Sequence, residues 1–334
     1  MEDFASVMKA IIIKGAGGPE VVEVGDRPVP EPGGDLVRVR VRATGLNRAD
    51  LLQAQGVYPA PKGVPADIPG LEFAGVIDAL GPDVAEPLKL GDRVFGIVAG
   101  GSHAEYLLTH ERTLMPIPSH LDFTAAAAIP EAFLTAHDAL ITLGGLAPGE
   151  RVLIHAAGSG VGTAAVQLAR AMSCKIFGTS RTAAKLEKTR ELGLDVAIDT
   201  SRDAFDEIIR QQTAGEGVQV VLDLIGAAVL EGNLKALARG GRLVCVGLLS
   251  GRKATLDLNL VLARRLTLVG TTLRSRPLEE KISATRLFAR QVIPWIESGL
   301  VRPIIDSVFP VAEIRAAWAR MGSNESFGKI VVEF

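Results

Sequence analysis

A short loop of small residues constrains the fold of this chain more than any other feature. The apolar segment Arg151–Ala156 runs into Ala157–Gly162, which contains three glycines, and then into the helical pattern Thr163–Met172. Small residues let a helix start close to the strand before it, and the first N–H groups of that helix favour an anion. The loop therefore predicts a binding site for the pyrophosphate of a dinucleotide. A ligand-free glycine turn is the alternative, which the flanking strand and helix disfavour.

Strand and helix patterns alternate regularly on both sides of this loop, which predicts a parallel, doubly wound sheet of the Rossmann type. The expected strands are Arg151–Ala156, Lys175–Ser180, Val196–Asp199, Val218–Ile225, Gly241–Gly247 and Leu266–Thr272, and the expected helices are Phe133–Leu143, Gly160–Met172, Thr182–Leu192, Arg202–Gln212 and Val229–Ala238.

The first third of the chain is rich in Pro and Gly and has a different pattern. Its short β-type runs are separated by turn residues, which predicts a compact, mostly β domain. A helix at Leu278–Ser298 and a strand at Lys329–Glu333 are expected in the tail. The β-type runs are Ala10–Ile13, Val21–Val24, Leu36–Ala43, Glu72–Ile77 and Asp92–Ile97, and a short helix is expected at Thr124–Ala128.

The residues after the second strand of the alternating series predict which dinucleotide binds. A site selective for NAD usually places an acidic residue there, to accept from the ribose 2′-hydroxyl. This chain has Ser180 and Arg181, with Lys185 in the next helix. Hydroxyl, guanidinium and ammonium groups suit a 2′-phosphate, so NADPH is favoured over NADH. A helix N-cap at Ser180 followed by a surface charge is the alternative.

Ligands of such sheets lie at the carboxyl ends of the strands, so the later strand ends should complete the cofactor crevice. Gly226, the pair Gly247 and Leu248, and Leu273 follow three of these strands. In the glycine loop, the expected contacts come from Gly158, Ser159, Gly160, Val161 and Gly162. Ordinary strand-end turns are the alternative for the later positions.

Bulk composition narrows the classes of partner. At 334 residues the chain is long enough for two domains. Its 36 basic and 38 acidic residues give a net charge of −2, which disfavours nucleic acid or an anionic membrane as the main partner. Cys174 and Cys245 are two lone cysteines in apolar surroundings, as in a reducing cytoplasm. The opening Met1–Val7 lacks the pattern of a signal peptide, and a cytoplasmic protein is expected.

Several motifs together resemble the medium-chain dehydrogenase/reductase superfamily, and within it the zinc-free quinone oxidoreductases, in particular the tumour-suppressor-inducible group. The resemblance runs from about Met8 to Phe334 and implies a chaperonin-10-like domain over residues 1–130, a Rossmann domain over 131–272, and a return to the first domain over 273–334. The matching stretches are Gly45–Gln53, Gly56–Pro59, Gly70–Gly75, Gly91–Val94, Pro130–Ala136, the glycine loop and Leu273–Arg276.

The resemblance also implies that no metal is bound. Zinc alcohol dehydrogenases of the superfamily carry a cysteine where this chain has Asn47 and a histidine where it has Leu71, and a lobe with four cysteines that a two-cysteine chain cannot supply. The five histidines show no metal-ligand spacing with Cys or Asp. Without a Lewis acid, an acceptor that takes hydride readily is favoured, such as a quinone or a conjugated enone.

The resemblance assigns roles to individual residues. It implies that Asn47, Asp50 and Tyr58 line the nicotinamide and substrate cleft, with Tyr58 able to protonate a quinol oxygen, and that Thr135 contacts the nicotinamide end of the cofactor. It implies a homodimer through edge strands near Leu266–Thr272. A turn former at Asn47, a helix N-terminal charge at Asp50 and a loop aromatic at Tyr58 are the structural alternatives.

Three positions depart from the family pattern. Ser159 replaces the middle glycine of the loop, Asp199-Thr200 stands where many relatives have a tyrosine near the adenosine phosphate, and Ser102-His103 predicts a different cleft rim. The resulting hypothesis is an NADPH-dependent quinone reductase. The alternatives are a reductase of activated C=C bonds in enals, enones or enoyl thioesters, and a cofactor-binding structural or RNA-binding protein like the lens-crystallin branch, which the balanced charge disfavours.

Overall fold

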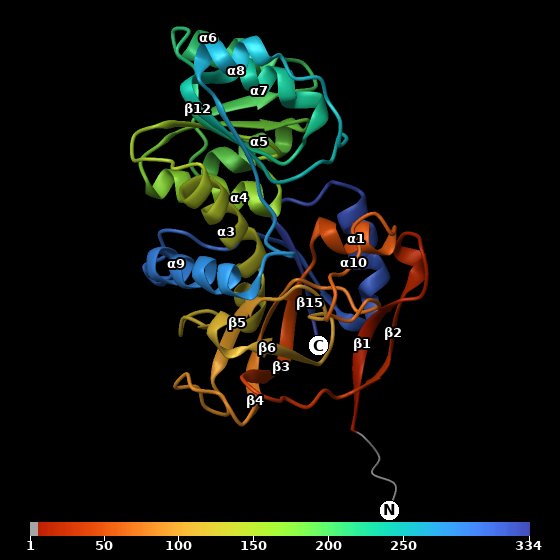
Figure 1. Ribbon diagram of the computed structural model, residues 1–334. Helices are drawn as coiled ribbons and strands as arrows, with labels where there is room; N and C mark the ends of the chain where they lie inside the picture. The colour runs from red at the N-terminus through yellow and green to blue at the C-terminus, as the bar shows by residue number, and fades with distance from the viewer. Residues whose placement is uncertain (1–5) are drawn as a thin grey trace, which may run out of the picture. The chain divides into compact units, whose positions relative to one another are not determined.

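A computed structural model describes residues 6–334. The expectation that no signal peptide is present was based on Met1–Val7, and the first five of these residues lie outside the described part. The chain divides into two compact units (Figure 1). The first unit contains the residues up to Glu131 together with 273–297 and 303–334, and the second unit contains 132–272 with 298–302. Within residues 6–334, no helix is long and apolar enough to cross a membrane.

The second unit contains a six-stranded sheet in which every strand pair is parallel, in the order β10-β9-β8-β11-β12-β13. The chain runs from β8 through β9 to β10 on one side and from β11 through β12 to β13 on the other, so the order reverses between β8 and β11. The predicted doubly wound sheet is confirmed. The strands are β8 (Arg151–Ile154), β9 (Lys175–Ser180), β10 (Val196–Asp199), β11 (Val218–Asp223), β12 (Leu237–Cys245) and β13 (Thr267–Gly270).

Helices flank this sheet and bury its apolar residues; Leu153, Phe177 and Val221 are at most 1% exposed. Cys174 is buried, whereas Cys245 is half-buried. The helices are α3 (Pro130–His137), which begins at the end of the first unit and continues as a π-helical turn η3 (Asp138–Leu143), α4 (Gly160–Ala171), α5 (Ala183–Glu191), α6 (Phe205–Gln212), the 3₁₀ turn η4 (Ala227–Val229), α7 (Leu230–Ala236) and α8 (Leu258–Arg264).

Some expected boundaries in this unit are wrong. The helix expected over Val229–Ala238 ends at Ala236, and the strand expected over Gly241–Gly247 already begins at Leu237. Leu237 pairs with Val218 before an irregularity in the register, and Gly240 inside the strand has a φ of +74°. Two adjacent glycines in the sequence therefore mark a kink within a strand, not the turn before one.

The first unit is built on a mixed seven-stranded sheet, in the order β14-β15-β3-β4-β5-β7 with β6 also paired to β3, and a separate pair β1-β2. Its strands are β1 (Val7–Ile13), β2 (Val22–Pro28), β3 (Leu36–Gly45), β4 (Glu72–Leu80), β5 (Arg93–Ile97), β6 (Tyr106–His110), β7 (Leu114–Pro116), β14 (Ile305–Pro310) and β15 (Lys329–Glu333). Its helices are α1 (Arg48–Ala54), α2 (Phe123–Ala127), α9 (Leu278–Glu297) and α10 (Ile314–Gly322), with 3₁₀ turns η1 (Pro19–Val21), η2 (Glu111–Thr113) and η5 (Val311–Glu313).

The last strand of the chain is placed in the interior of this sheet. β15 pairs antiparallel with the end of β3, with Val331 opposite Gly45, and parallel with β14 (Figure 1). Val331 and Val332 are fully buried, and Val332 belongs to a core cluster with Trp318 of α10. This pairing brings Lys329, the first residue of β15, beside the segment between β3 and α1.

The start of α4 lies very close to the loop after β8. A Cβ at Gly162 would lie 2.3 Å from the carbonyl oxygen of Ala156 and 2.7 Å from the carbonyl carbon of Ala157. Ala156 itself has a φ of +49°, which is uncommon for a residue with a side chain. Only glycine at position 162 allows this approach between backbone segments.

We therefore expect Gly162→Ala to reduce the free energy of unfolding by about 1–3 kcal/mol, because the loop or the helix must move to admit the methyl group. Chemical denaturation followed by circular dichroism measures this change. Gly33→Ala is the matched control, since a Cβ at Gly33 would meet no atom within 4 Å. Equal stability of the two variants would contradict the close approach.

Candidate functional site

The glycine loop of the second unit carries a capped helix N-terminus. Ser159 is the N-cap of α4, and its Oγ accepts a hydrogen bond from the backbone N–H of Gly162 at 3.0 Å. The N–H groups of Gly160 and Val161, in the first turn, have no acceptor within the helix. Ser159, expected as a departure from the family pattern, thus secures the helix start while these two donors stay available for an anion.

The candidate 2′-phosphate residues follow β9. Ser180 ends this strand, and its Oγ accepts from the N–H of Thr182 at 3.1 Å. Thr182, not Ser180, is the N-cap residue of α5. Arg181 is exposed, and Lys185 is half-buried in the first turns of α5. Two cationic side chains therefore lie within five residues of a strand end, as an anion site requires.

An acidic residue lies next to this strand end, as the sequence departure at Asp199 suggested. Asp199 is directly opposite Ser180 in the pairing of β10 with β9. Its Oδ1 accepts from the N–H and the Oγ of Ser201, at 3.0 and 2.6 Å. Its carboxylate is thus engaged in the turn after β10.

The loops after β11 and β12 pack against each other. Gly226 has a φ of +90°, and a Cβ there would lie 3.0 Å from the Cα of Leu248. Leu248 is 54% exposed, and Gly247 before it is half-buried. Thr135 lies on α3 and is buried. The sheet order brings the glycine loop and the loops after β9 and β11 to the same, carboxyl, ends of neighbouring strands, as a dinucleotide crevice requires.

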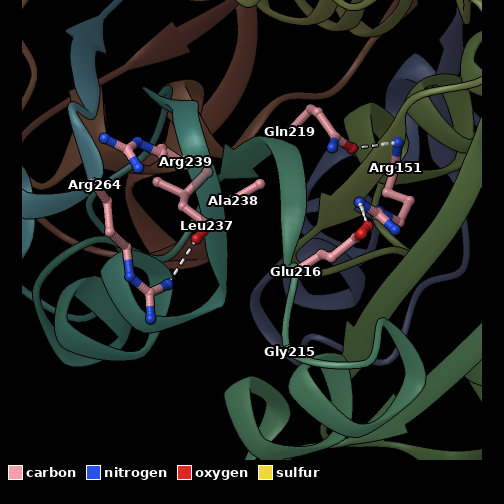
Figure 2. Close-up of a pocket in the computed structure, with 8 residues that line it drawn as sticks. All are labelled: Arg151, Gly215, Glu216, Gln219, Leu237, Ala238, Arg239 and Arg264. Atoms are coloured by element: carbon pink, nitrogen blue, oxygen red, sulfur yellow. Dashed lines mark hydrogen bonds and ion pairs between the residues drawn. The ribbon is translucent and has the colours of Figure 1, made fainter.

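The second unit also has a surface cavity of about 440 Å³, which lies at the opposite ends of the strands (Figure 2). Arg151, the first residue of β8, lines it together with Glu216, and the two form an ion pair of 2.6 Å. Arg264 donates to the carbonyl oxygen of Leu237 at 2.7 Å. Both cations are bound to protein groups, and the cavity lies at the strand ends opposite the glycine loop, so we assign it no role in binding the cofactor.

In the first unit, a buried ammonium group organises the residues that the resemblance assigns to the active site. Lys329 Nζ contacts Glu72 Oε1 at 2.5 Å, and donates to the carbonyl oxygen of Leu46 at 2.8 Å and to Asn47 Oδ1 at 2.7 Å. Asn47 Nδ2 in turn donates to Glu72 Oε1 at 2.9 Å and to the carbonyl oxygen of Gly45 at 3.2 Å. The amide of Asn47 is therefore held by protein partners on both sides.

Asp50 is a buried helix-terminal carboxylate. Its Oδ2 accepts from the backbone N–H of Asn47 at 2.8 Å and its Oδ1 from that of Gly70 at 3.0 Å. These bonds secure the start of α1 and join it to the segment before β4. Asp50 thus acts as the helix N-terminal charge that was considered as the structural alternative. A role in contact with substrate stays a prediction for Asp50.

Ser102 and His103 are fully buried, and a different cleft rim at this place stays a prediction. Ser102 Oγ lies 3.1 Å from Thr44 Oγ1, and His103 Nε2 lies 3.9 Å from Asp50 Oδ2. Burial lowers the pKa of His103, which keeps its ring neutral. The close packing of these residues on Gly70 accounts for their burial, because a Cβ at Gly70 would lie 2.3 Å from Ser102 Oγ.

Tyr58 is held in the first unit by a buried arginine to which the sequence reasoning gave no role. Arg274 Nη1 donates to the carbonyl oxygen of Tyr58 at 3.1 Å, and its guanidinium lies over the Tyr58 ring at 5.1 Å. Its Nε donates to the carbonyl oxygen of Ala99 at 2.7 Å, and its Nη2 donates to Gln53 Oε1. Arg274 follows Leu273, which is also buried. The matching stretch Leu273–Arg276 contains this residue, but the stretch alone does not indicate its distant partners.

Glu131 is a second charged residue near these groups to which the sequence reasoning gave no role. Its N–H donates to Glu72 Oε2 at 2.8 Å, at the start of α3. The residue keeps partial exposure, yet protein surrounds its carboxyl, and burial followed by the charges of Glu72 and Asp50 raises its pKa to about 8. Lys329 and Arg274 act in the opposite direction. The carboxyl is therefore mainly protonated at neutral pH.

The donor chemistry of the site does not suit a metal ion. In the part of the chain that the structure describes, no group of three or more His, Cys, Asp or Glu side chains is arranged to hold one. Asn47 and Glu72 are bound to the Lys329 ammonium, as described above. That the protein works without zinc stays a prediction.

Comparison with known proteins gives the family. Residues 33–119 match the alcohol dehydrogenase GroES-like domain, and residues 160–290 match the zinc-binding dehydrogenase family. The quinone oxidoreductase of Lama guanicoe is 33% identical over 98% of this chain and 97% of its own length.

Solved structures resemble the chain over nearly its whole length. An NAD-dependent alcohol dehydrogenase has 34% identity and a TM-score of 0.86, covering 98% of this chain and 100% of its own. A mycobacterial protein complexed with NADPH has 27% identity and a TM-score of 0.88, covering 98% and 100%. The CurK enoyl reductase has 29% identity and a TM-score of 0.86, covering 98% and 99%. The chain has a GroES-like unit and a Rossmann-type unit, and its relatives include quinone oxidoreductases. It therefore belongs to the medium-chain dehydrogenase/reductase superfamily of oxidoreductases.

Proposed function

We propose that the chain is an NADPH-dependent, zinc-independent quinone reductase. The observation that carries the proposal is the Lys329 cluster. The Lys329 ammonium binds the side chain of Asn47, which stands where the resemblance gives zinc-dependent relatives a cysteine ligand. The likeness to quinone oxidoreductases over nearly the full length supports the acceptor class.

The second unit would hold the cofactor, which supplies the hydride when it is bound. The free N–H groups at the start of α4 suit the pyrophosphate. Arg181 and Lys185 suit a 2′-phosphate, with Ser180 beside them, and Thr135 is assigned to the nicotinamide end. Gly226 supports this fit, since its φ of +90° and its approach to Leu248 leave no room for a side chain.

The first unit would supply the proton that reduction of a quinone also requires. Tyr58 is one donor, and its backbone and ring are fixed by Arg274. Glu131 is a second donor, because its carboxyl is mainly protonated at neutral pH. Its charge interacts with those of both Asp50 and Arg274, so the carboxyl lies near these residues. A neutral carboxylic acid in a largely buried site is an effective general acid near neutral pH.

Reduction of an activated C=C bond is the second candidate. The likeness to an enoyl reductase favours it, and so does a buried acid, since saturation of the double bond needs a proton delivered to carbon. The two reactions differ in their product, a quinol in one case and a saturated carbonyl compound in the other.

We expect the protein to oxidise NADPH with 1,2- or 1,4-quinones, and to have a higher kcat/KM with NADPH than with NADH. Arg181→Ala should lower kcat/KM for NADPH by about tenfold and leave that for NADH within about twofold, because only NADPH carries the 2′-phosphate. The absorbance of the reduced nicotinamide measures kcat/KM with each cofactor, and identification of the product shows whether a quinol is formed. Saturated products from enones at higher kcat/KM would support the second candidate instead.

Arg190→Ala is the matched control, since it removes an exposed guanidinium from the same helix, α5, at a position paired with Glu187. If Arg181→Ala and Arg190→Ala have the same effect, or if no quinone accelerates NADPH oxidation, the assignment is wrong.

The pH dependence of turnover tests Glu131 as a proton donor. A donor acts in its protonated form, so kcat/KM should be constant below the pKa of about 8 and fall as pH rises through it. Glu131→Gln should lower kcat/KM at pH 7 by about 10–100-fold and remove this decline. Stopped-flow or steady-state rates between pH 6 and 9.5 measure the profile.

Two further variants separate the possible donors. Glu313→Gln changes an exposed glutamate and should keep the wild-type profile. Tyr58→Phe should also keep the decline near pH 8 if Glu131 causes it. A decline that persists in Glu131→Gln and disappears in Tyr58→Phe would assign the proton to Tyr58.

We also propose a homodimer in which the outer edge of β13 pairs with a second copy. β13 is the last strand of the six-stranded sheet, and Leu268 on it is 38% exposed. An unpaired edge with exposed apolar side chains favours strand addition. Sedimentation equilibrium at micromolar concentration should show a dimer, and Leu268→Lys should weaken it while Leu300→Lys, at another exposed leucine, does not. A monomeric wild-type protein would contradict the proposal.

A further inference from the structure

His155 lies at the point where the order of the strands in the second unit reverses. It directly follows β8, whose neighbours in the sheet are β9 on one side and β11 on the other. The N–H of His155 donates to the carbonyl oxygen of Leu222 on β11 at 3.1 Å, and the N–H of Ala157 donates to that of Thr179 on β9 at 2.9 Å. The backbone here is bonded to both halves of the sheet.

The side chain of His155 makes the same two connections through a buried polar network. Its Nδ1 lies 2.8 Å from Thr179 Oγ1, and its Nε2 lies 2.7 Å from Asn233 Oδ1. Asn233 Nδ2 then donates to Asp223 Oδ2 at 3.0 Å. All four residues are at most 3% exposed. The imidazole also packs edge-on against Phe205, with the ring centroids 4.9 Å apart.

The direction of every hydrogen bond in this network follows from one carboxylate. Asp223 accepts hydrogen bonds at both carboxyl oxygens, so Asn233 presents its NH₂ to Asp223 and its Oδ1 to His155. His155 Nε2 therefore carries the proton, and Nδ1 is left to accept from the hydroxyl of Thr179. The imidazole is neutral in this arrangement. Burial lowers the pKa of His155, while Asn233 and Asp223 act in the opposite direction.

The two ends of the network are residues that shape the proposed cofactor crevice. Asp223 Oδ1 accepts from the N–H groups of Ile225 and Gly226, at 2.7 and 2.9 Å, and so fixes the loop after β11. Thr179, at the other end, is followed directly by Ser180 and Arg181. A continuous chain of hydrogen bonds thus joins the loop after β9, where the 2′-phosphate is expected, to the loop after β11, on the other side of the strand-order reversal, where the rest of the cofactor is expected.

We propose that His155 is a positioning residue that sets the spacing between the adenosine side and the nicotinamide side of the crevice, acting as a neutral Nε2–H imidazole held between Thr179 and Asn233. The proposal rests on the proposed function, because it takes NADPH as the ligand. His155 is 1% exposed, so in this proposal it acts through the two loops and not by direct contact.

Fixed spacing has a specific consequence for binding. A ligand that spans both loops needs them at the correct separation, whereas a fragment that occupies one loop does not. A network with a merely structural role would instead change the stability of the protein, or the affinity for whole ligand and fragment alike. The two cases can be distinguished by comparing NADPH with 2′-AMP, which carries only the adenosine and its 2′-phosphate.

The test uses Thr179→Val and Thr179→Ser, measured by isothermal titration calorimetry in the full-length protein. Valine matches the shape of threonine but leaves His155 Nδ1 without its donor, and we expect the Kd for NADPH to rise about tenfold and that for 2′-AMP to change less than twofold. Serine keeps the hydroxyl and should restore the NADPH affinity. Thr213→Val is the control, because it removes a buried hydroxyl before the opposite end of β11, where Thr213 Oγ1 accepts from Gly217 N–H.

A second measurement reads the network without any ligand. In ¹⁵N-labelled protein, the imidazole signals of His155, identified by their loss in His155→Gln, should show the neutral Nε2–H form at pH 7. Asp223→Asn, which keeps the shape but can donate, should allow Asn233 to flip and move the proton to Nδ1.

The outcomes separate this proposal from the proposed function. If wild-type protein shows the Nε2–H form but does not bind NADPH, the cofactor assignment fails and the positioning role fails with it. If NADPH binds and Thr179→Val leaves its Kd unchanged, or weakens 2′-AMP equally, the positioning role alone is overturned. A protonated or Nδ1–H imidazole in the wild-type protein would also overturn it.

Discussion

The ion pair between Lys329 and Glu72 is the interaction on which the arrangement of the first unit depends. A buried charge is stable only when it is paired and hydrogen-bonded, and here the ammonium is bonded to Glu72, Asn47 and the carbonyl oxygen of Leu46. The last strand of the chain supplies this cation, so the site is complete only when β15 has joined β3. Burial, and after it the charges of Glu72 and Asp50, raise the pKa of Glu131 to about 8, and the Lys329 ammonium acts in the opposite direction.

The second unit solves a different problem, which is to bring loops from several strands to one crevice. The small residues after β8 permit the close start of α4, and the order of the strands reverses between β8 and β11, which is where sheets of this kind bind their ligands. A polar network beneath the loops joins Thr179 to Asp223 through His155 and Asn233. Buried polar groups of this kind are costly unless all are satisfied, and each member of this network has its partner.

The sequence predicted those features that local pattern determines. The alternation of apolar strands and helices gave the doubly wound sheet, and the glycine spacing gave the loop before α4. The early start of β12 was not predicted, because Gly240 is typical of a turn and its strand is recognised only once it is paired; the short helix α8 was not predicted either. The roles of Arg274 and Lys329 depend on contacts with Gln53 and Asn47 that are 221 and 282 residues away in sequence, which no local pattern reveals. Glu131 was missed for the same reason, since its pKa is set by residues that only the fold brings near.

The central claim is that reduction proceeds in a site organised by an internal ammonium and not by a metal ion. The most direct test measures metal content by mass spectrometry and NADPH-dependent quinone reduction in the same preparation, before and after dialysis against a strong chelator. We predict full turnover with far less than one zinc per chain, and no gain when zinc is added. Activity that follows zinc content, lost on dialysis and restored by the metal, would contradict the account.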